Sequence, residues 1–472
     1  MQTIFTKFID NYIVLIFLAI LTSILIFLSL PINTGWVDGA VYLTADFKSA
    51  YPQYPFIYPV FCHYFFDLFN HTSRGIYLIC FLQLGILFGA QLYFASVFEN
   101  KTAKSLALLL LSLNAPLIAI EKSIASEGIF CSILILLVAV LYQYEKSGKT
   151  GYLNVLLLLA MLLAFIRHLG IVFLIVPFLY LLIKSIKNLS LHPQFIRTVF
   201  KLLLMCILII FTNQVIQKTS GASGEIMYGR AACNRINQTY HEANEKKRKL
   251  ILDKWKGQTN DELLKSSIEF IAVSDTNSMW LGPYQKIDSL ITIYDKNKIS
   301  HVYKTPDGYL NNAYIIYLSS MDIEVAFKIA GDMIGMYFGG GLHNESAIIN
   351  CESYNNVNSG LSNLIKPGEL LDPSKKSACN EIAHNIPLRL FNILTPIVLM
   401  LLVWFVLRMN KKIEQFGYSI CATFIITGFI YCLLHTAISV REARYALPMQ
   451  VIFFMLLVLL IVQGKENKQN NK

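Results

Sequence analysis

The residues of this chain that are suited to chemistry lie at the ends of long apolar runs. Asp38 follows the first of these runs, beside Gly39 and close to the aromatic residues Trp36 and Tyr42. A carboxylate in such a place can act as a general base that takes the proton of an acceptor group. Spacing alone favours a turn or helix-cap role for Asp38 beside Gly39, so both interpretations stay open.

Basic residues occur in three short turns between later runs. These turns contain Lys122 with Glu121 and Glu127, Arg167 with His168, and Arg441 with Arg444. Each group could be an ordinary anchor at a membrane interface. Arginine also binds phosphate through paired hydrogen bonds, so the same cations are consistent with an anionic phosphate partner.

The segment 51–59 alternates tyrosines with three prolines. Proline restricts the backbone and keeps such a segment extended. Tyr54 and Tyr58 could then offer aromatic faces to a sugar ring, although an ordinary interfacial loop has the same composition.

Several common chemistries leave no signature in the sequence. There is no CxxC pair and no HExxH motif, so a structural zinc site or a zincin is not supported. Gly339-Gly340-Gly341 lacks the lysine and the spacing of a phosphate loop. No basic patch interleaved with aromatics indicates nucleic acid, and neither ATP hydrolysis nor a cytoplasmic nucleotide-sugar donor is indicated.

The elements that must position these residues are membrane helices. Of the 472 residues, 55% are hydrophobic and only 15% are charged, which excludes an ordinary soluble enzyme. The uncharged runs approach the length that a helix needs to cross a bilayer. We therefore expect an all-α polytopic membrane protein with about ten transmembrane helices, at 12–30, 75–97, 105–120, 128–144, 151–166, 169–184, 200–216, 388–407, 416–436 and 446–463.

The first run and the region 151–184 each allow more than one interpretation. The first lacks the cleavage site of a secretory signal, so we expect it to be retained. The region 151–184 would be overlong as one helix and contains Arg167-His168 at its centre. A cation is costly in mid-membrane, so we expect two helices joined by a tight turn.

The basic residues also predict an orientation. Lysines and arginines cluster on alternate connections, at 101–104, 146–149, 184–201 and 408–412. The positive-inside rule places these connections and both termini in the cytoplasm. The turns with Glu127, Arg167 and Arg444 then face outwards, and the net charge of +10 reports topology and lipid contact.

Three regions follow: an N-terminal transmembrane module over 1–216, a mixed extracytoplasmic insert over 217–387, and a C-terminal transmembrane module with a cytoplasmic tail over 388–472. In the insert we expect a basic helix over 242–255. A second helix over 322–337 is too charged to span, and we expect it to lie along the membrane surface or to cap the bundle. Cys351 and Cys379 could form a disulfide in an oxidising compartment.

Five features together resemble the GT-C superfamily of glycosyltransferases. They are the acidic residue after the first helix, the Tyr/Pro-rich first loop, Ser-Glu-Gly at 126–128, Ile-Arg-His-Leu-Gly at 166–170 and Arg-Tyr-Ala-Leu-Pro at 444–448. Their order and common sidedness carry the resemblance, which covers about 1–216 and 388–463. Relatives of this type are the protein O-mannosyltransferases and the lipid A aminoarabinose transferase.

This resemblance implies transfer of a hexose or pentose from a polyprenyl-phosphate donor to a glycan, lipid or protein acceptor, with inversion, at the outer face of a bacterial inner membrane. The family often has two adjacent acids where this chain has Asp38-Gly39, so Glu127 or Asp46 would supply the second carboxylate. The implied site comprises Asp38 and Glu127 as catalytic residues, Arg444, Arg167, Arg441, Lys122 and His168 at the donor phosphate, and Tyr42, Tyr54, Tyr58 and Tyr445 at the substrates.

No cofactor is certain. Some relatives bind a divalent metal ion and others do not, so the resemblance leaves a metal open. His343 and Glu345 could be ligands, although an ordinary loop is the favoured interpretation of that segment.

Two other functional classes stay open. An O-antigen polymerase or ligase also uses a polyprenyl-linked donor, but its key residues would concentrate in the insert. A transporter or flippase of a lipid-linked glycan would carry ionisable residues at helix midpoints and paired broken helices. The apolar runs are nearly free of charge, which favours the transferase.

Overall fold

The computed structural model describes residues 12–29, 39, 42–43, 55–219, 228–274, 281–339, 394–404, 407, 417–438 and 443–470. Within these ranges the ordered elements are helices and there is no strand, so the predicted all-α class is confirmed. Several residues singled out from the sequence lie outside the described ranges: Asp38, Asp46, Tyr54, Arg441, His343, Glu345, Cys351 and Cys379.

The described helices include five that are long and apolar enough to cross a membrane. They are α5 (Ser73–Ser96), α8 (Glu127–Ser147), η1 with α10 (His168–Lys187), the first part of α11 (Phe195–Thr219) and α21 (Tyr418–Ile438). Shorter apolar helices include α2 (Tyr12–Ser29), α9 (Thr150–Ile166), the segment 394–404 and the apolar part of α22 (Ala443–Asn470). The chain is therefore a helical membrane protein, and ten spans stay a prediction.

The run predicted as one helix over 105–120 is two helices. α6 (Lys101–Ser112) ends before Asn114, and α7 (Ala115–Glu121) begins directly after it. The Asn114 side chain accepts a hydrogen bond from the backbone N–H of Leu117, 3.1 Å away, and Pro116 lies in the first turn of α7. Asparagine caps and early prolines both favour a new helix start.

The predicted break at Arg167-His168 is confirmed. α9 ends at Ile166, Arg167 is extended, and the 3-10 helix η1 (His168–Leu174) leads into α10 (Ile175–Lys187). Gly170 makes this turn tight, because a Cβ there would lie 1.9 Å from the backbone oxygen of Leu163. Only glycine lets η1 approach the end of α9 this closely.

α8 is the central helix of the bundle. Most of its residues are buried, and it packs on α5, α9 and α22. α11, in contrast, leaves most of its apolar residues exposed, as expected of a helix that faces lipid. The central position of α8 fixes Glu127, its first residue, in the interior.

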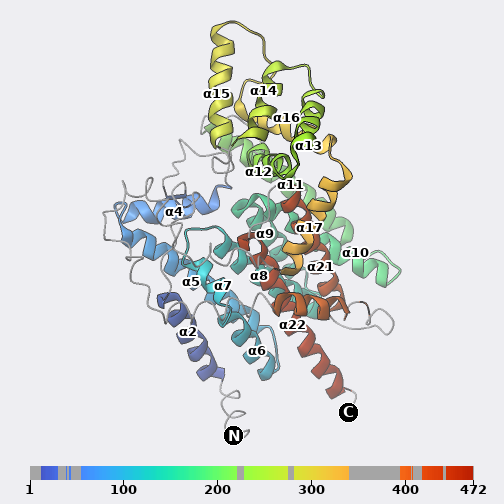
Figure 1. Cartoon of the computed structure of the whole chain (residues 1–472). Helices are drawn as coiled ribbons and strands as arrows, with labels where there is room; N and C mark the ends of the chain where they lie inside the picture. Colours follow the sequence, from blue (N-terminus) through green and yellow to red (C-terminus); the bar gives the residue numbers. More distant parts are fainter. Residues whose placement is uncertain are drawn as a thin grey trace.

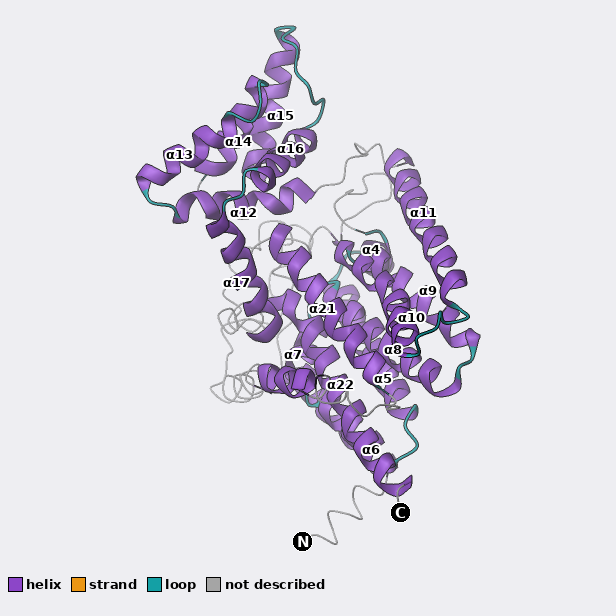
Figure 2. Cartoon of the chain, turned by 90° about the vertical axis from the view of Figure 1, so that its right-hand side faces the viewer, coloured by secondary structure: helices purple, strands orange, loops and turns teal. Residues whose placement is uncertain are grey.

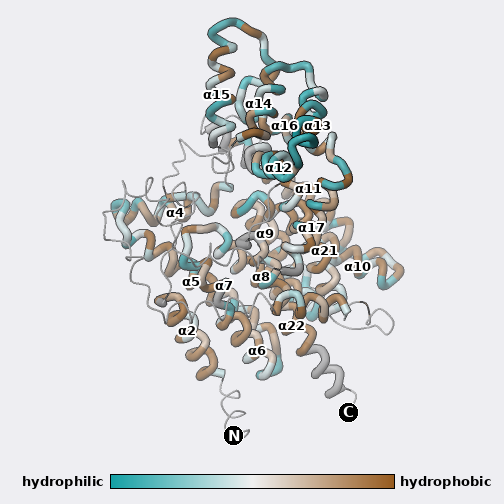
Figure 3. Tube along the Cα trace, viewed as in Figure 1, coloured by the Kyte–Doolittle hydropathy of each residue, from teal (hydrophilic) through white to brown (hydrophobic). Residues whose placement is uncertain are grey.

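The insert forms a helical unit with its own hydrophobic core. It contains α12 (Tyr228–Glu242), α13 (Glu245–Lys256), α14 (Glu262–Val273), α15 (Leu281–Lys296) and α16 (Pro306–Ser319), which enclose Ile236, Trp255, Ile268 and Tyr317 among others. This unit lies at the opposite end of the molecule from both termini (Figure 1). Along its chain, hydrophilic residues are more frequent than in the bundle, which is largely hydrophobic (Figure 3). We call its side of the bundle the insert end.

α17 (Ile323–Gly339) connects the insert to the bundle. Its charged residues lie in its first ten positions, whereas Met333, Met336 and Tyr337 are buried. The Tyr337 hydroxyl donates to the backbone oxygen of Ile425, 2.8 Å away and near the middle of α21. α17 therefore runs down along α21 (Figure 2) and does more than cap the bundle.

Candidate functional site

A buried ion pair lies at the start of α8. Glu127 Oε1 and Arg167 Nη1 are 2.6 Å apart, and their side chains are only 3% and 12% exposed. The guanidinium also lies over the ring of Phe130, with 5.9 Å to the ring centre, and 3.5 Å from the hydroxyl of Ser126. Two residues predicted from separate turns, 40 positions apart in the sequence, are thus in direct contact.

Aromatic contacts place this pair in the half of the bundle nearer the insert. The ring of Phe130 packs against Phe173, with centres 5.7 Å apart, and Phe173 packs against Tyr431, with centres 5.8 Å apart. Tyr431 lies past the midpoint of α21, and the end of α21 meets the insert. Tyr431 is fully buried, and its hydroxyl has no hydrogen-bond partner. It interacts electrostatically with Arg167 and Glu127.

Glu121 is a second buried carboxyl beside the same turn. It is 0% exposed, Ser132 donates a long 3.4 Å hydrogen bond to its Oε1, and its Oε2 has no hydrogen-bond partner. A Cβ on Gly128 would lie 2.5 Å from that Oε2, so the carboxyl packs directly against the first turn of α8. Burial raises the pKa of Glu121 to about 8, and the group is therefore neutral at pH 7.

Lys122 serves the fold of the bundle. Its Nζ donates to the backbone oxygen of Phe27, 2.6 Å away in the last turn of α2, and lies 4.8 Å from the centre of the Phe27 ring. Carbonyls in a last helical turn lack partners within the helix, and lysine is a favourable one. Burial lowers the pKa of Lys122 to about 8. This cation, predicted at the donor phosphate, is turned towards α2.

Tyr42 and Tyr58 are also engaged inside the protein. The Tyr58 hydroxyl donates to Gln83 Oε1 at 2.7 Å, and the edge of one tyrosine ring meets the face of the other at 4.9 Å between centres. Gln83 Nε2 donates in turn to the backbone oxygens of Glu121 and Ser123, at 2.9 and 3.0 Å. Both tyrosines are buried, so they brace the turn before α8 and show no open face to a sugar.

Three further predicted residues lie within the described ranges. His168 is exposed at the start of η1. Arg444 and Tyr445 lie in the first turn of α22, where the backbone but not their side chains is described. The structure therefore brings Glu127 and Arg167 together, and directs Lys122, Tyr42 and Tyr58 to internal contacts.

Sequence reasoning missed Gln83, Glu121 and Tyr431 as members of the cluster. Gln83 could have been noticed, because it is an amide within the apolar run 75–97. Glu121 directly follows an apolar run, and that position is typical of a charged residue at a membrane interface. Tyr431 resembles any other tyrosine in an apolar run, and only the packing of η1 on α21 makes it a neighbour of Arg167.

The guanidinium of Arg167 is the group of this centre that is chemically suited to an anion. Arginine is the side chain best suited to a phosphate, and Glu127 holds its guanidinium in one orientation. Within the described ranges, no group of three or more His, Cys, Asp or Glu side chains is placed to hold a metal ion.

Comparisons with protein-family models, with curated proteins and with solved structures found no match to this chain. The resemblance to the GT-C superfamily therefore stands on the sequence motifs alone.

Proposed function

We propose that this chain is an integral membrane glycosyltransferase that moves a sugar from a polyprenyl-phosphate donor to an acceptor at the insert end. The observation that carries the proposal is the Glu127–Arg167 ion pair. It joins the Ser-Glu-Gly and Ile-Arg-His-Leu-Gly motifs, two of the five features on which the resemblance rests. It also does so in the half of the bundle nearer the insert, the side that the basic residues predict to face outwards.

The proposed reaction needs a base and a stabilised leaving group. Asp38 takes the proton of the acceptor hydroxyl, and the acceptor oxygen attacks the anomeric carbon of the sugar from the face opposite the phosphate. The bond between the anomeric carbon and the phosphate oxygen breaks, and that oxygen keeps the electron pair. The products are the glycosylated acceptor and polyprenyl phosphate, with inverted configuration at the anomeric carbon.

The cations serve the departing phosphate in this scheme. Negative charge develops on the leaving oxygen, and preorganised donors stabilise such charge most effectively in a water-poor site. Arg444 opens α22 and is the main candidate. Arg167 is the second, and Glu127 acts as its positioning residue, because its carboxylate pairs with the guanidinium at 2.6 Å.

The scheme also implies where the reaction takes place. The donor arrives within the lipid, with its phosphate at the interface, and the reaction takes place on the outer face of a bacterial inner membrane. The acceptor is a glycan, a lipid or a protein in the same compartment.

A transfer assay tests the proposal. The purified protein in nanodiscs receives radiolabelled sugar on undecaprenyl phosphate, with native membrane extract as acceptor. We expect Asp38→Asn and Arg444→Ala to abolish transfer, and Arg167→Ala to reduce it strongly. Lys149→Ala is the matched control, because this exposed lysine lies in the connection before α9 and should leave transfer unchanged.

The opposite result has a clear meaning. Full transfer by folded Asp38→Asn and Arg444→Ala proteins would reject the first loop and the start of α22 as the site. Charge-removing substitutions in the insert would then test the polymerase or ligase alternative.

A further inference from the structure

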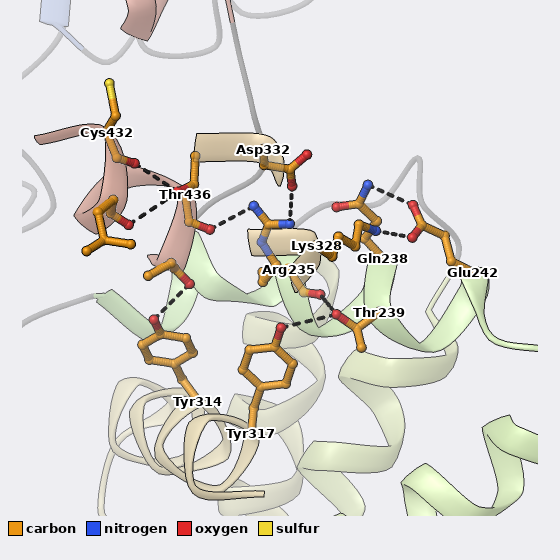
Figure 4. A network of polar contacts seen from close by, with 12 residues as sticks. Arg235, Gln238, Thr239, Glu242, Tyr314, Tyr317, Lys328, Asp332, Cys432 and Thr436 are labelled. Carbon is orange, nitrogen blue, oxygen red and sulfur yellow. Dashed lines mark hydrogen bonds and ion pairs between the residues drawn. The ribbon is translucent and has the colours of Figure 1, made fainter. Parts of the chain in front are cut away.

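A fully buried arginine lies where the insert meets the bundle. Arg235 of α12 has a side chain that is 0% exposed. Its Nη1 donates to Asp332 Oδ2 of α17 at 2.6 Å, and its Nη2 donates to the backbone oxygen of Thr436 at 2.7 Å (Figure 4). One side chain of the insert therefore holds two helices of the bundle.

The contact with Thr436 is a helix cap. Thr436 lies in the last turn of α21, where backbone carbonyls have no partner within the helix and carry partial negative charge. The Tyr314 hydroxyl of α16 donates to the next carbonyl, that of Ala437, at 2.9 Å. The insert thus supplies the C-terminal cap of a helix that belongs to the bundle.

This contact differs in kind from the ion pairs around it. Lys328 pairs with Glu242, and Lys247 pairs with Glu324, between the same parts of the chain. These side chains are partly or largely exposed, and pairs of this type contribute little. A buried arginine is costly unless its partners are all in place, so the Arg235 contact requires one fixed arrangement of α12, α17 and α21.

The capped turn lies shortly before the start of α22 in the sequence. Arg444 follows Thr436 by eight positions in the sequence. We propose that Arg235 is a positioning residue of the donor-phosphate site, which fixes the last turn of α21 and through it the first turn of α22. The role at the donor phosphate rests on the proposed function. The clamp, by which Arg235 joins the insert to α17 and α21, rests on the contacts alone.

The test compares Arg235→Met and Arg235→Lys with a matched control, Lys328→Met. The control removes the more exposed ion pair of Lys328 with Glu242 from the same α12–α17 contact. Amide hydrogen exchange is measured over 428–450 in the full-length protein. We expect faster exchange at the end of α21 and the start of α22 in Arg235→Met, partial recovery in Arg235→Lys, and the wild-type pattern in the control.

A second readout follows the site itself. Affinity for undecaprenyl phosphate is measured in nanodiscs, and we expect it to fall about tenfold in Arg235→Met, as in Arg444→Ala, with no change in Lys328→Met. If Arg235→Met does not fold, Tyr314→Phe and Asp332→Asn remove the neighbouring bonds singly and provide the same comparison.

Two results would overturn the inference. Unchanged exchange in Arg235→Met would show that there is no clamp, and faster exchange with unchanged affinity would show a clamp that does not position the site. A wild-type protein that does not bind undecaprenyl phosphate at all would reject the proposed function and the positioning role with it, while the exchange pattern would still report on the clamp.

Discussion

Gly128 leaves room for the buried carboxyl of Glu121. The position of a Cβ on Gly128 is 2.5 Å from the buried carboxyl of Glu121, closer than two such atoms can lie. We expect Gly128→Ala to lower stability by about 1–3 kcal/mol, as overpacked cores do. The thermal transition of the purified protein in detergent measures this.

The matched variants make this expectation specific. Gly85→Ala should be tolerated, because nothing lies within 4 Å of its Cβ position. Adding Glu121→Ala to Gly128→Ala should restore part of the loss, because it removes the carboxyl that the new methyl group meets. A double variant less stable than Gly128→Ala alone would contradict the shared space.

The protonation of Glu121 predicts a pH dependence. Its pKa rises from 4.5 to about 8 on folding, so between these values the native state holds a proton that the unfolded state has lost. The contribution of Glu121 to stability is therefore full below about pH 4.5 and is lost as the pH rises to about 8. Glu121→Gln cannot ionise and lacks this slope.

The measurement is the difference in unfolding free energy between wild type and Glu121→Gln from pH 5 to pH 8. This difference should shift steadily against the wild type as the pH rises. Lys122, whose pKa falls to about 8, titrates in both proteins and largely cancels. A constant difference across the range would mean that Glu121 is ionised in the native state.

Residue types were easier to predict than residue partners. Glu127 and Arg167 were identified from their place beside apolar runs, and they proved to be in contact. The inward roles of Lys122 and Tyr58 depend on Phe27 and Gln83, which come from other helices. A sequence pattern cannot report such tertiary neighbours, so it assigned these side chains to a substrate.

At the scale of elements, the turn between α9 and η1 offers the sharpest prediction. A Cβ on Gly170 would meet backbone atoms of Leu163 and Ala164, which cannot rotate away. We expect Gly170→Ala to cost more than about 3 kcal/mol, the range of severe single substitutions, or to prevent folding. Yield of monodisperse protein and the thermal transition measure this.

Gly151→Ala is the control for that variant. Gly151 lies in the first turn of α9 with open space around its Cβ position, and alanine has the higher helix propensity. The control should be neutral or slightly stabilising. Equal behaviour of the two variants would mean that η1 does not pack on α9 as described.

Apolar runs predicted most helices, because length and hydrophobicity dominate in a membrane protein. They failed where local chemistry interrupted a run, as Asn114 and Pro116 do between α6 and α7. They predicted α17 as a helix, but not that its second half packs along α21.

At the scale of the whole molecule, the proposed orientation can be tested by labelling. Lys286→Cys in α15 and Lys149→Cys before α9 are both exposed and lie at the insert and on the proposed cytoplasmic side. With Cys351 and Cys379 replaced by serine, an impermeant maleimide should label position 286 in intact cells. Position 149 should react only after permeabilisation, and the reverse pattern would invert the topology.

The general plan of the molecule was predictable, but its assembly was not. Charge and hydropathy separate a polar insert from apolar modules on either side of it. Nothing in those patterns indicates that a single arginine would dock the insert on α21, because this contact joins residues 201 positions apart.

The three charged residues of α17 link its packing to the folding of the insert. Glu324, Lys328 and Asp332 each pair with a residue of α12 or α13, and an unpaired charge is expensive beside lipid. The contact of Asp332 with the fully buried Arg235 can therefore form only once α12 is in place. We therefore expect a defect in α12 to disturb the packing of α17, a segment made later, against α21.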